Sequence, residues 1–168
     1  MSKGSAALGV IALILAAGGL GLGGLAWIET QAVSFSNPIS WFKYNGTAFY
    51  ISPVGTYLTF DGLTIEFELG PDESVYFSFS SKAHVEAVAG WSRISVYFRV
   101  DGFMELTPSA QVGMYNGGFT NHYSVHLQDV RDDLLPGVHT VTVVIRGTYS
   151  ANYIWESSLI VQKVSNVE

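Results

Sequence analysis

Hydrophobic and polar residues follow two different patterns along the chain. Residues 5–28 are a run of 24 uncharged and mostly apolar residues. From residue 32 onward, hydrophobic residues occupy every second position in one segment after another, which is typical of β-strands with one buried and one solvent-facing side. The sequence therefore predicts a short leader or cytoplasmic stub at 1–4, an apolar α-helix at 5–28 and a β-domain at 29–168.

The alternation is clearest in four segments, whose predicted inward-facing residues are Leu63, Ile65, Phe67 and Leu69; Val75, Phe77 and Phe79; Ile94, Val96, Phe98 and Val100; and Val141, Val143 and Ile145. Intervening residues such as Ser95, Tyr97 and Thr142 are expected to face solvent. Turn pairs, among them Asp61-Gly62 and Asp101-Gly102, separate the segments. About eight strands without an intervening helical pattern predict a mainly β fold, an antiparallel β-sandwich of the jelly-roll type.

The apolar run is long enough to cross a membrane. A helix of that length measures about 36 Å, and the hydrocarbon core of a bilayer measures about 30 Å. Trp27 and Ile28 suit an anchor at the membrane interface, so we expect the segment to be retained. Cleavage as a secretion signal is the alternative, with Thr30 to Ala32 as the small-x-small site. Lys3 before the run and Glu29 after it place the β-domain outside the cell.

Small residues recur along the apolar run with an average period of 3.5, which keeps one narrow helix face small. That face comprises Ser5, Gly9, Ala12, Ala16, Gly19, Gly23 and Ala26. Small residues let helix backbones approach closely, and a period of 3.5 suits left-handed packing of helices. The pattern predicts that the helix packs against its own copies. The alternative is that glycine and alanine are simply common in membrane helices. A G-x-G-x-x-G match in the same run has no βαβ context and predicts no nucleotide site.

The first residues resemble the start of archaeal type IV pilins and related prepilin-like proteins. In that family a short basic leader ends in Lys-Gly or Arg-Gly and is cut directly before a long apolar helix, and Lys3, Gly4 and Ser5 fit this pattern. The leader is only four residues long, and Gly9 stands where bacterial pilins carry a glutamate. The resemblance implies cleavage between Gly4 and Ser5 and assembly into a filament.

The last third of the chain resembles the end of a C1q/tumour-necrosis-factor-like jelly-roll. A Pro-Gly turn precedes the penultimate strand, and the final strand carries a Ser-x-Leu-x-Val run. The matching residues are Pro136, Gly137, His139, Val141, Val143, Ser157, Leu159 and Val161. The resemblance implies a display or recognition module, often trimeric, and not a catalyst.

Composition excludes several functions. Fourteen acidic residues against eight basic ones give a net charge of −6, and the basic residues form no cluster. Such a chain is a poor partner for nucleic acid, whose phosphates require Lys and Arg. The sequence contains no cysteine, which excludes disulfides, thiolate metal sites and cysteine nucleophiles. No motif of a hydrolase, metalloprotease or phosphate-binding loop is present, so we expect neither an enzyme nor a cofactor.

Two groups of residues have the chemistry of metal ligands, but their spacing argues against a site. His122 and His126 are four residues apart, which on a strand is about 13 Å and too far for one ion. We expect both to be exposed, like His84 on the polar side of its own segment. Asp129, Asp132 and Asp133 suit Ca²⁺ chemically, but they do not match a calcium-loop pattern and are interpreted as a solvated turn. We therefore predict no metal.

Aromatic residues are dense in SWFKYNGTAFYISPVGTYLTF, residues 40–60. Most of them are expected in the sandwich core, and exposed ones suit contact with a carbohydrate or a protein. Asn45, Gly46 and Thr47 form an N-glycosylation sequon, and Asn-Gly is also a turn pair.

These observations predict that the protein is a non-enzymatic cell-surface structural subunit. Its helix inserts in the membrane and packs with its copies as a homo-oligomer, by extension a pilus-like filament, while the jelly-roll head is displayed outside. The first alternative is a monomeric, membrane-tethered recognition module that binds a glycan or a protein. A virion surface protein of similar layout is the second alternative.

Overall fold

The computed structural model of the protein describes residues 40–87, 90–115 and 118–165. The predicted helix, its small face and the Gly4–Ser5 processing site lie outside these residues, so they stay predictions. No helix in the described part of the chain is long and apolar enough to span a membrane.

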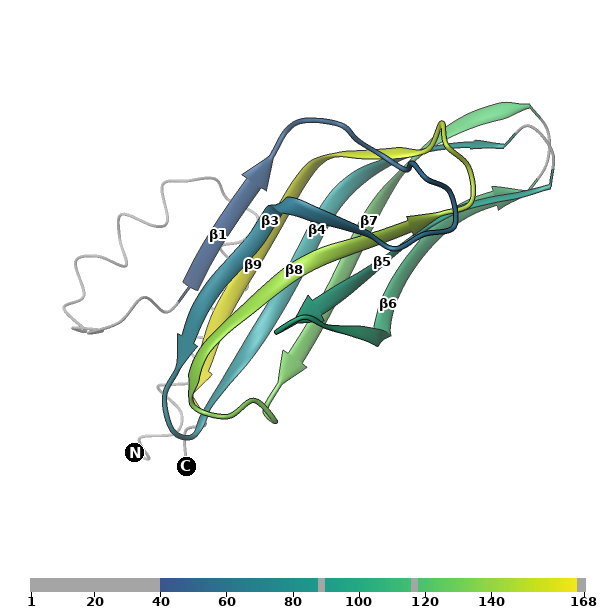
Figure 1. The fold of residues 1–168 in the computed structure, drawn as a ribbon. Coiled ribbons are helices and arrows are strands. Elements are labelled where there is room, and N and C mark those ends of the chain that lie inside the picture. Colours follow the sequence, from purple (N-terminus) through teal and green to yellow (C-terminus); the bar gives the residue numbers. More distant parts are fainter. Residues whose placement is uncertain (1–39, 88–89, 116–117, 166–168) are drawn as a thin grey trace, which may run out of the picture. The chain divides into compact units, whose positions relative to one another are not determined.

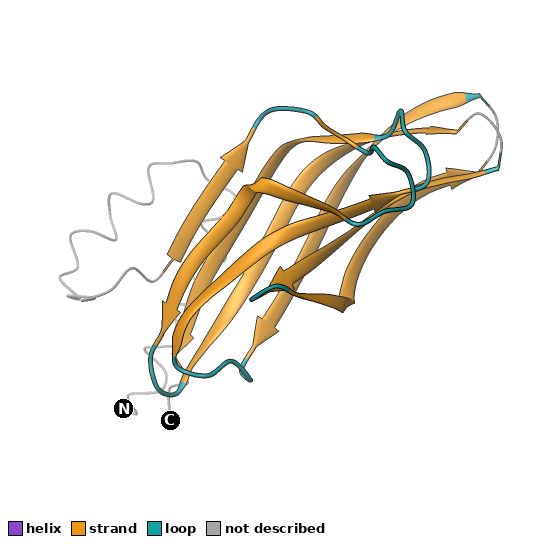
Figure 2. Cartoon of the chain, in the orientation of Figure 1, coloured by secondary structure: helices purple, strands orange, loops and turns teal. Residues whose placement is uncertain are grey.

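The described residues form strands connected by turns and loops (Figure 2). The strands are β1 (Ser40–Asn45), β2 (Phe49–Tyr50), β3 (Leu58–Leu69), β4 (Glu73–Ala87), β5 (Trp91–Val100), β6 (Phe103–Tyr115), β7 (Phe119–Arg131), β8 (Gly137–Gly147) and β9 (Tyr153–Ser165).

The strands build a sandwich of two antiparallel sheets. Sheet A has the order β1-β9-β4-β7, with β2 also paired to β9, and sheet B has the order β3-β8-β5-β6. In the view of Figure 1, β3 and β8 of sheet B pass in front of β9 and β4 of sheet A. The pairs β1·β9, β3·β8, β4·β7 and β5·β6 are nested, as if one long antiparallel ribbon had been folded over itself. This connectivity is that of a jelly-roll and confirms the predicted sandwich.

The core lies between the sheets and consists of the residues that the alternation selected. All fourteen residues predicted to point inward are buried. Phe77 of sheet A contacts Phe67 and Phe98 of sheet B, with ring centroids 5.7 and 5.6 Å apart. Since each fully buried Phe side chain stabilises the fold by about 1.5–3 kcal/mol, contacts of this kind hold the two sheets face to face.

The predicted turns are correct in one case and wrong in another. Asp101 and Gly102 join β5 to β6 with φ values of 50° and 84°, the left-handed conformations that a tight type I′ hairpin requires. The prediction of a turn at Asp61-Gly62 was wrong, because both residues lie inside β3. The register of β3 against β8 shifts there between Phe60 and Thr64. The pair marks a β-bulge, which uses the same permissive residues as a turn.

Part of the outer side of sheet B is covered, contrary to the prediction that its alternate residues face solvent. Ser95, Tyr97 and Thr142 are all buried. The segment between β2 and β3 lies against two residues of this side: the Tyr57 ring packs edge-on against Tyr97 at 5.5 Å, and Arg146 Nε donates to the carbonyl of Gly55 at 2.9 Å. The alternating sequence pattern predicts which residues are buried by the opposite sheet. It does not predict that a loop covers residues on the outer side.

Candidate functional site

Four ring side chains form a continuous row across the outer face of sheet A. Tyr50 on β2 is paired with Tyr153 on β9, Tyr153 with His84 on β4, and His84 with His122 on β7. The row is therefore fixed by backbone register. We call these four residues the ring row.

The rings of the row lie against one another. His84 stacks on Tyr153 with centroids 4.4 Å apart and planes at 14°, and Tyr50 lies 5.1 Å from Tyr153. These spacings match the 4.7–4.9 Å separation of neighbouring strands. The His84 and Tyr153 rings are stacked face to face, and Tyr50 and His122 are tilted against the two ends of this pair.

The two histidines of the ring row meet directly. His84 Nδ1 lies 3.1 Å from His122 Nε2. Burial lowers the pKa of His84, and repulsion from His122 lowers it further, against a smaller opposing effect of Glu86. The pKa of His84 therefore lies below the ordinary histidine value of about 6.5. Sequence reasoning placed both residues on strands but missed their pairing, which only the register of β4 with β7 reveals.

A β-bulge beside the row positions Trp155. The register of β4 with β9 shifts between Ser80 and Lys82, and Glu156 takes a φ of 49° there. Inside the bulge the buried Ser81 hydroxyl lies 2.8 Å from the Ser157 hydroxyl and 3.0 Å from the Trp155 carbonyl. These contacts hold the backbone that carries the Trp155 ring, whose centroid lies 5.3 Å from that of His122 in a T-shaped arrangement.

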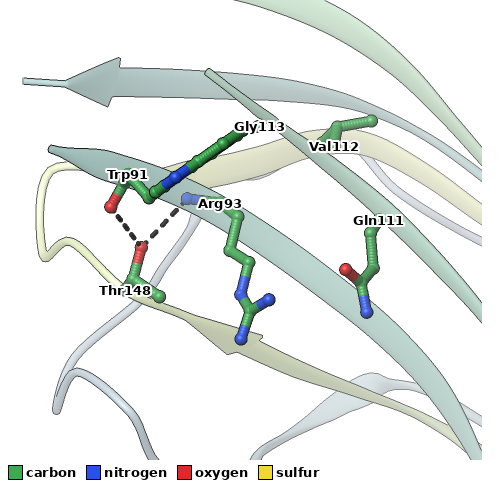
Figure 3. Close-up of a pocket in the computed structure, with 6 residues that line it drawn as sticks. All are labelled: Trp91, Arg93, Gln111, Val112, Gly113 and Thr148. Atoms are coloured by element: carbon green, nitrogen blue, oxygen red, sulfur yellow. Dashed lines mark hydrogen bonds between the residues drawn. The ribbon is translucent and has the colours of Figure 1, made fainter. Parts of the chain in front are cut away.

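A hollow of about 500 Å³ lies on the outer face of sheet B, over β5 and β6 (Figure 3). The residues that line it are Trp91, Arg93, Gln111, Val112, Gly113 and Thr148. We call it the Trp91 hollow.

The Trp91 hollow exists because one position in the sheet has no side chain. Arg93 is paired with Gly113, whereas the flanking pairs Trp91–Tyr115 and Ser95–Gln111 have side chains on both strands. A Cβ on Gly113 would lie 2.7 Å from the carbonyl oxygen of Ser92 and 2.9 Å from Arg93 Cβ. Only glycine fits this close approach of β5 and β6, and the gap that it leaves is open to solvent.

Two polar residues hold the wall of the Trp91 hollow. The Thr148 hydroxyl accepts the Arg93 backbone N–H at 2.9 Å and lies 3.4 Å from the Trp91 carbonyl (Figure 3). Behind it, the fully buried Asn152 accepts the Glu86 N–H of sheet A at 2.9 Å and bonds to Ser92 of sheet B at 3.0 Å. Asn152 therefore ties the two sheets together at the end that carries both the hollow and the ring row.

The side chains of the Trp91 hollow are available for a ligand. Trp91 is 71% exposed, and its ring contacts Tyr115 at 5.1 Å. Within the described ranges, the Arg93 guanidinium and the Gln111 carboxamide form no hydrogen bond or ion pair to other side chains. An exposed indole beside unpaired guanidinium and amide groups gives one apolar surface and two sets of hydrogen-bonding groups. The sequence offered no signal for this, since the residues are spread over three segments.

The other candidate residues do not form a site. His126 lies exposed on β7, as expected. Asp133 binds Arg131 in a two-bond ion pair of 2.7 and 2.8 Å, while Asp129 lies on β7, where burial raises its pKa. No group of three or more His, Asp or Glu side chains suited to a metal occurs in the part of the chain that the structure describes. The Asn45 carboxamide oxygen accepts the Thr47 N–H at 2.8 Å, and its glycosylation stays a prediction.

The residues of the C1q/tumour-necrosis-factor-like resemblance lie in two different sheets. Gly137 begins β8 in sheet B, while Leu159 and Val161 are buried in β9 of sheet A. His139 lies between the sheets at the end of the core and contacts Phe67. Its Nδ1 lies 2.7 Å from Asp101 Oδ2, and its Nε2 donates to the Leu135 carbonyl at 2.7 Å. This histidine fixes the β5–β6 turn to β8, which is a structural role.

Comparison with known proteins identifies no family. No protein-family model and no curated protein matches the chain. Among solved structures, the chain is similar to that of infectious bursal disease virus Gx strain, with 11% identity over 77% of this chain and 34% of the other and a TM-score of 0.47. It is also similar to the CBM36-1 domain of a multidomain xylanase from the hindgut metagenome of Trinervitermes trinervoides, with 10% identity over 76% and 99% and a TM-score of 0.37. The chain spans about a third of the viral chain's length.

Proposed function

We propose that the protein is a non-enzymatic cell-surface recognition module and that its jelly-roll head binds a carbohydrate in the Trp91 hollow. The observation that carries this proposal is the arrangement of an exposed Trp91 ring beside the unpaired Arg93 and Gln111 side chains, over a gap that Gly113 keeps open.

The chemistry of the hollow suits a sugar. A pyranose ring has an apolar face of C–H groups that packs on an indole, and hydroxyls around its rim that need hydrogen-bond partners. Arg93 and Gln111 supply such partners, and a guanidinium also binds a carboxylate with two parallel hydrogen bonds. The volume of about 500 Å³ lies within the range of small-ligand sites. We expect uronate-containing glycans to bind more tightly than neutral ones, because Arg93 is the charged group of the hollow.

Binding without hydrolysis is favoured by what lines the hollow. Glycoside hydrolysis requires a pair of carboxylates on either side of the scissile bond. None of the described residues lining the hollow is acidic. The same residues that would hold a sugar would therefore leave it intact.

Binding to a panel of immobilised neutral and uronate-containing oligosaccharides tests the proposal. Trp91→Ala should weaken binding at least tenfold, and Arg93→Ala should weaken binding of the uronate glycans more than that of the neutral ones. Trp155→Ala, on sheet A, is the matched control and should bind as the wild type does. If no glycan of either class binds, or if Trp155→Ala loses binding and Trp91→Ala keeps it, the proposed site is wrong.

A second function, self-assembly through the N-terminal segment, is supported by a separate feature. On the edge strand β1, Phe42 and Tyr44 are 63% and 59% exposed, and Phe42 is paired with the exposed Ile160 of β9. Exposed apolar side chains at a sheet edge suit contact with another subunit. Together with the small-residue face of residues 5–26, they support a membrane-anchored homo-oligomer, with a pilus-like filament as its extended form.

Replacing both Gly19 and Gly23 with leucine tests the assembly. The segment stays apolar, so membrane insertion should survive, while the added side chains should keep neighbouring helices apart. Cross-linking of the full-length protein should then show loss of oligomers, and Leu8→Ile and Leu15→Ile serve as controls that retain them. Wild-type assembly of the double variant would make the segment a simple anchor. A native N-terminus at Ser5, measured by mass spectrometry, is expected if the leader is cleaved.

A further inference from the structure

We propose that His84 and His122 form a two-histidine binding site for a divalent transition-metal ion of the zinc–copper class on the outer face of sheet A. The site is separate from the proposed carbohydrate site, which lies on the other sheet. It uses imidazole nitrogens, which are the commonest ligands of these ions in proteins.

The separation of the two nitrogens fits one shared ion. His84 Nδ1 and His122 Nε2 lie 3.1 Å apart. With Zn–N bonds of about 2.0–2.1 Å, two ligands of a tetrahedral ion are about 3.3–3.4 Å apart. The nitrogens therefore need to separate by only a few tenths of an ångström, and each ring turns so that its lone pair points to the ion instead of to the other nitrogen. The same pair of nitrogens now shares one proton in a hydrogen bond, and metal binding would place that proton on the other nitrogen of its ring, so that both lone pairs reach the ion.

The surrounding structure holds both rings in place before any ion arrives. Their strands pair without a register shift from Val75–Arg131 to Ala87–Phe119, and His84 faces His122 within this ladder. The Tyr153 ring stacks on His84, and the Trp155 ring lies edge-on to His122. A site whose ligands are fixed by packing loses little conformational entropy on binding.

The charges around the pair favour a cation. Glu86 lies two residues beyond His84 on the same face of β4, and its charge acts on His84. The nearest cation along β4, Lys82, is paired with Glu156 of β9. From β9, Tyr153 contributes only a phenol to this surface. Two protein ligands leave the remaining coordination positions to water, as in open metal sites.

Calorimetric titration of the full-length, detergent-solubilised protein with ZnCl₂ tests the site, with no histidine tag on the protein. One equivalent should bind, and the ring ¹⁵N resonances of His84 and His122 should shift together. His84→Ala and His122→Ala should each weaken binding at least tenfold. His126→Ala is the matched control, because it removes an exposed histidine from the same face of β7, and it should bind as the wild type does.

The Zn²⁺ affinity of His122→Ala decides between support for the proposal and its rejection. His122 is exposed, so His122→Ala should fold like the wild type and report on the site even if His84→Ala does not fold. Unchanged Zn²⁺ affinity in His122→Ala would overturn the proposal. It would also be overturned by an equal loss in His126→Ala, or by the absence of Zn²⁺ binding at submillimolar concentration, because the pair would then be a hydrogen-bonded surface contact.

Discussion

The outer faces of the two sheets belong to the same sandwich but present opposite kinds of surface. On sheet A, paired positions across four strands all carry rings, and the rings fill the spaces between strands by packing on each other. On sheet B, the β2–β3 segment covers part of the face, and the open part contains a gap where Gly113 faces Arg93. In the ring row every paired position carries a ring, whereas the Trp91 hollow lies where one paired position has no side chain.

The outer faces of the two sheets are also connected through one buried residue, Asn152. Asn152 bonds to the backbone of β4, which carries His84, and to Ser92 of β5, which lies between Trp91 and Arg93. A single buried carboxamide therefore positions one end of both surfaces.

Replacing Asn152 should produce the largest effect on both faces. Asn152→Ala leaves the Glu86 N–H and Ser92 without their partner in a buried setting, so we expect a loss of about 3 kcal/mol in the free energy of unfolding. Denaturant unfolding measures it. Asn121→Ala, which removes an exposed carboxamide from β7, is the control and should change stability by less than about 0.5 kcal/mol. Equal, small effects of both substitutions would show that Asn152 does not join the sheets.

Filling the gap in sheet B should affect that face alone. The new Cβ of Gly113→Ala would press on the backbone of Ser92, and overpacking of this kind should cost about 1–2 kcal/mol in stability. The Trp91 hollow should shrink and glycan binding should fall, while the ring row of sheet A stays unchanged. Gln111→Ala, on the same strand but without such a contact, should leave stability unchanged. Wild-type stability and binding in Gly113→Ala would refute the close approach of β5 and β6.

A smaller effect is expected on the pH dependence of stability, which should differ between His139 and His84. Burial alone would lower the pKa of His139, but the hydrogen bonds to Asp101 and to the Leu135 carbonyl outweigh it and raise the pKa. A raised pKa stabilises the fold below the ordinary value of about 6.5, and this contribution is lost as the pH rises through the raised pKa. The melting temperature should therefore fall less between pH 6 and 8 in His139→Gln than in the wild type.

His84 should behave in the opposite way. Its pKa is lowered, first by burial and then by His122, so its contribution is complete above about pH 6.5 and is lost as the pH falls from there through the lowered pKa. His84→Gln should reduce the loss of stability between pH 7 and 5. Parallel pH profiles for the two variants would contradict the assigned environments.

The sequence predicted the sandwich because alternation records which side of each strand meets the opposite sheet, as Phe77 and Phe98 show. It could not predict contacts that depend on register. His84 and His122 are 38 residues apart and looked like separate surface residues, and Gly113 carried no sign that it faces Arg93. Asp61-Gly62 was mistaken for a turn because bulges and turns use the same residues. The residues that line the Trp91 hollow come from three separate segments of the chain. Their proximity could therefore not be predicted from the sequence.

The four tryptophans provide the most direct measurement of which face binds a ligand. Trp91 lies in the hollow, Trp155 beside the ring row and Trp41 against the core, and Trp27 lies in the N-terminal segment. In a ¹H–¹⁵N spectrum each indole N–H gives its own signal. Titration with the best-binding oligosaccharide of the panel should shift the Trp91 indole and the amides of Arg93 and Gly113, and should leave the Trp155 indole unchanged. Shifts centred on Trp155 and Tyr153, with Trp91 unaffected, would contradict the account.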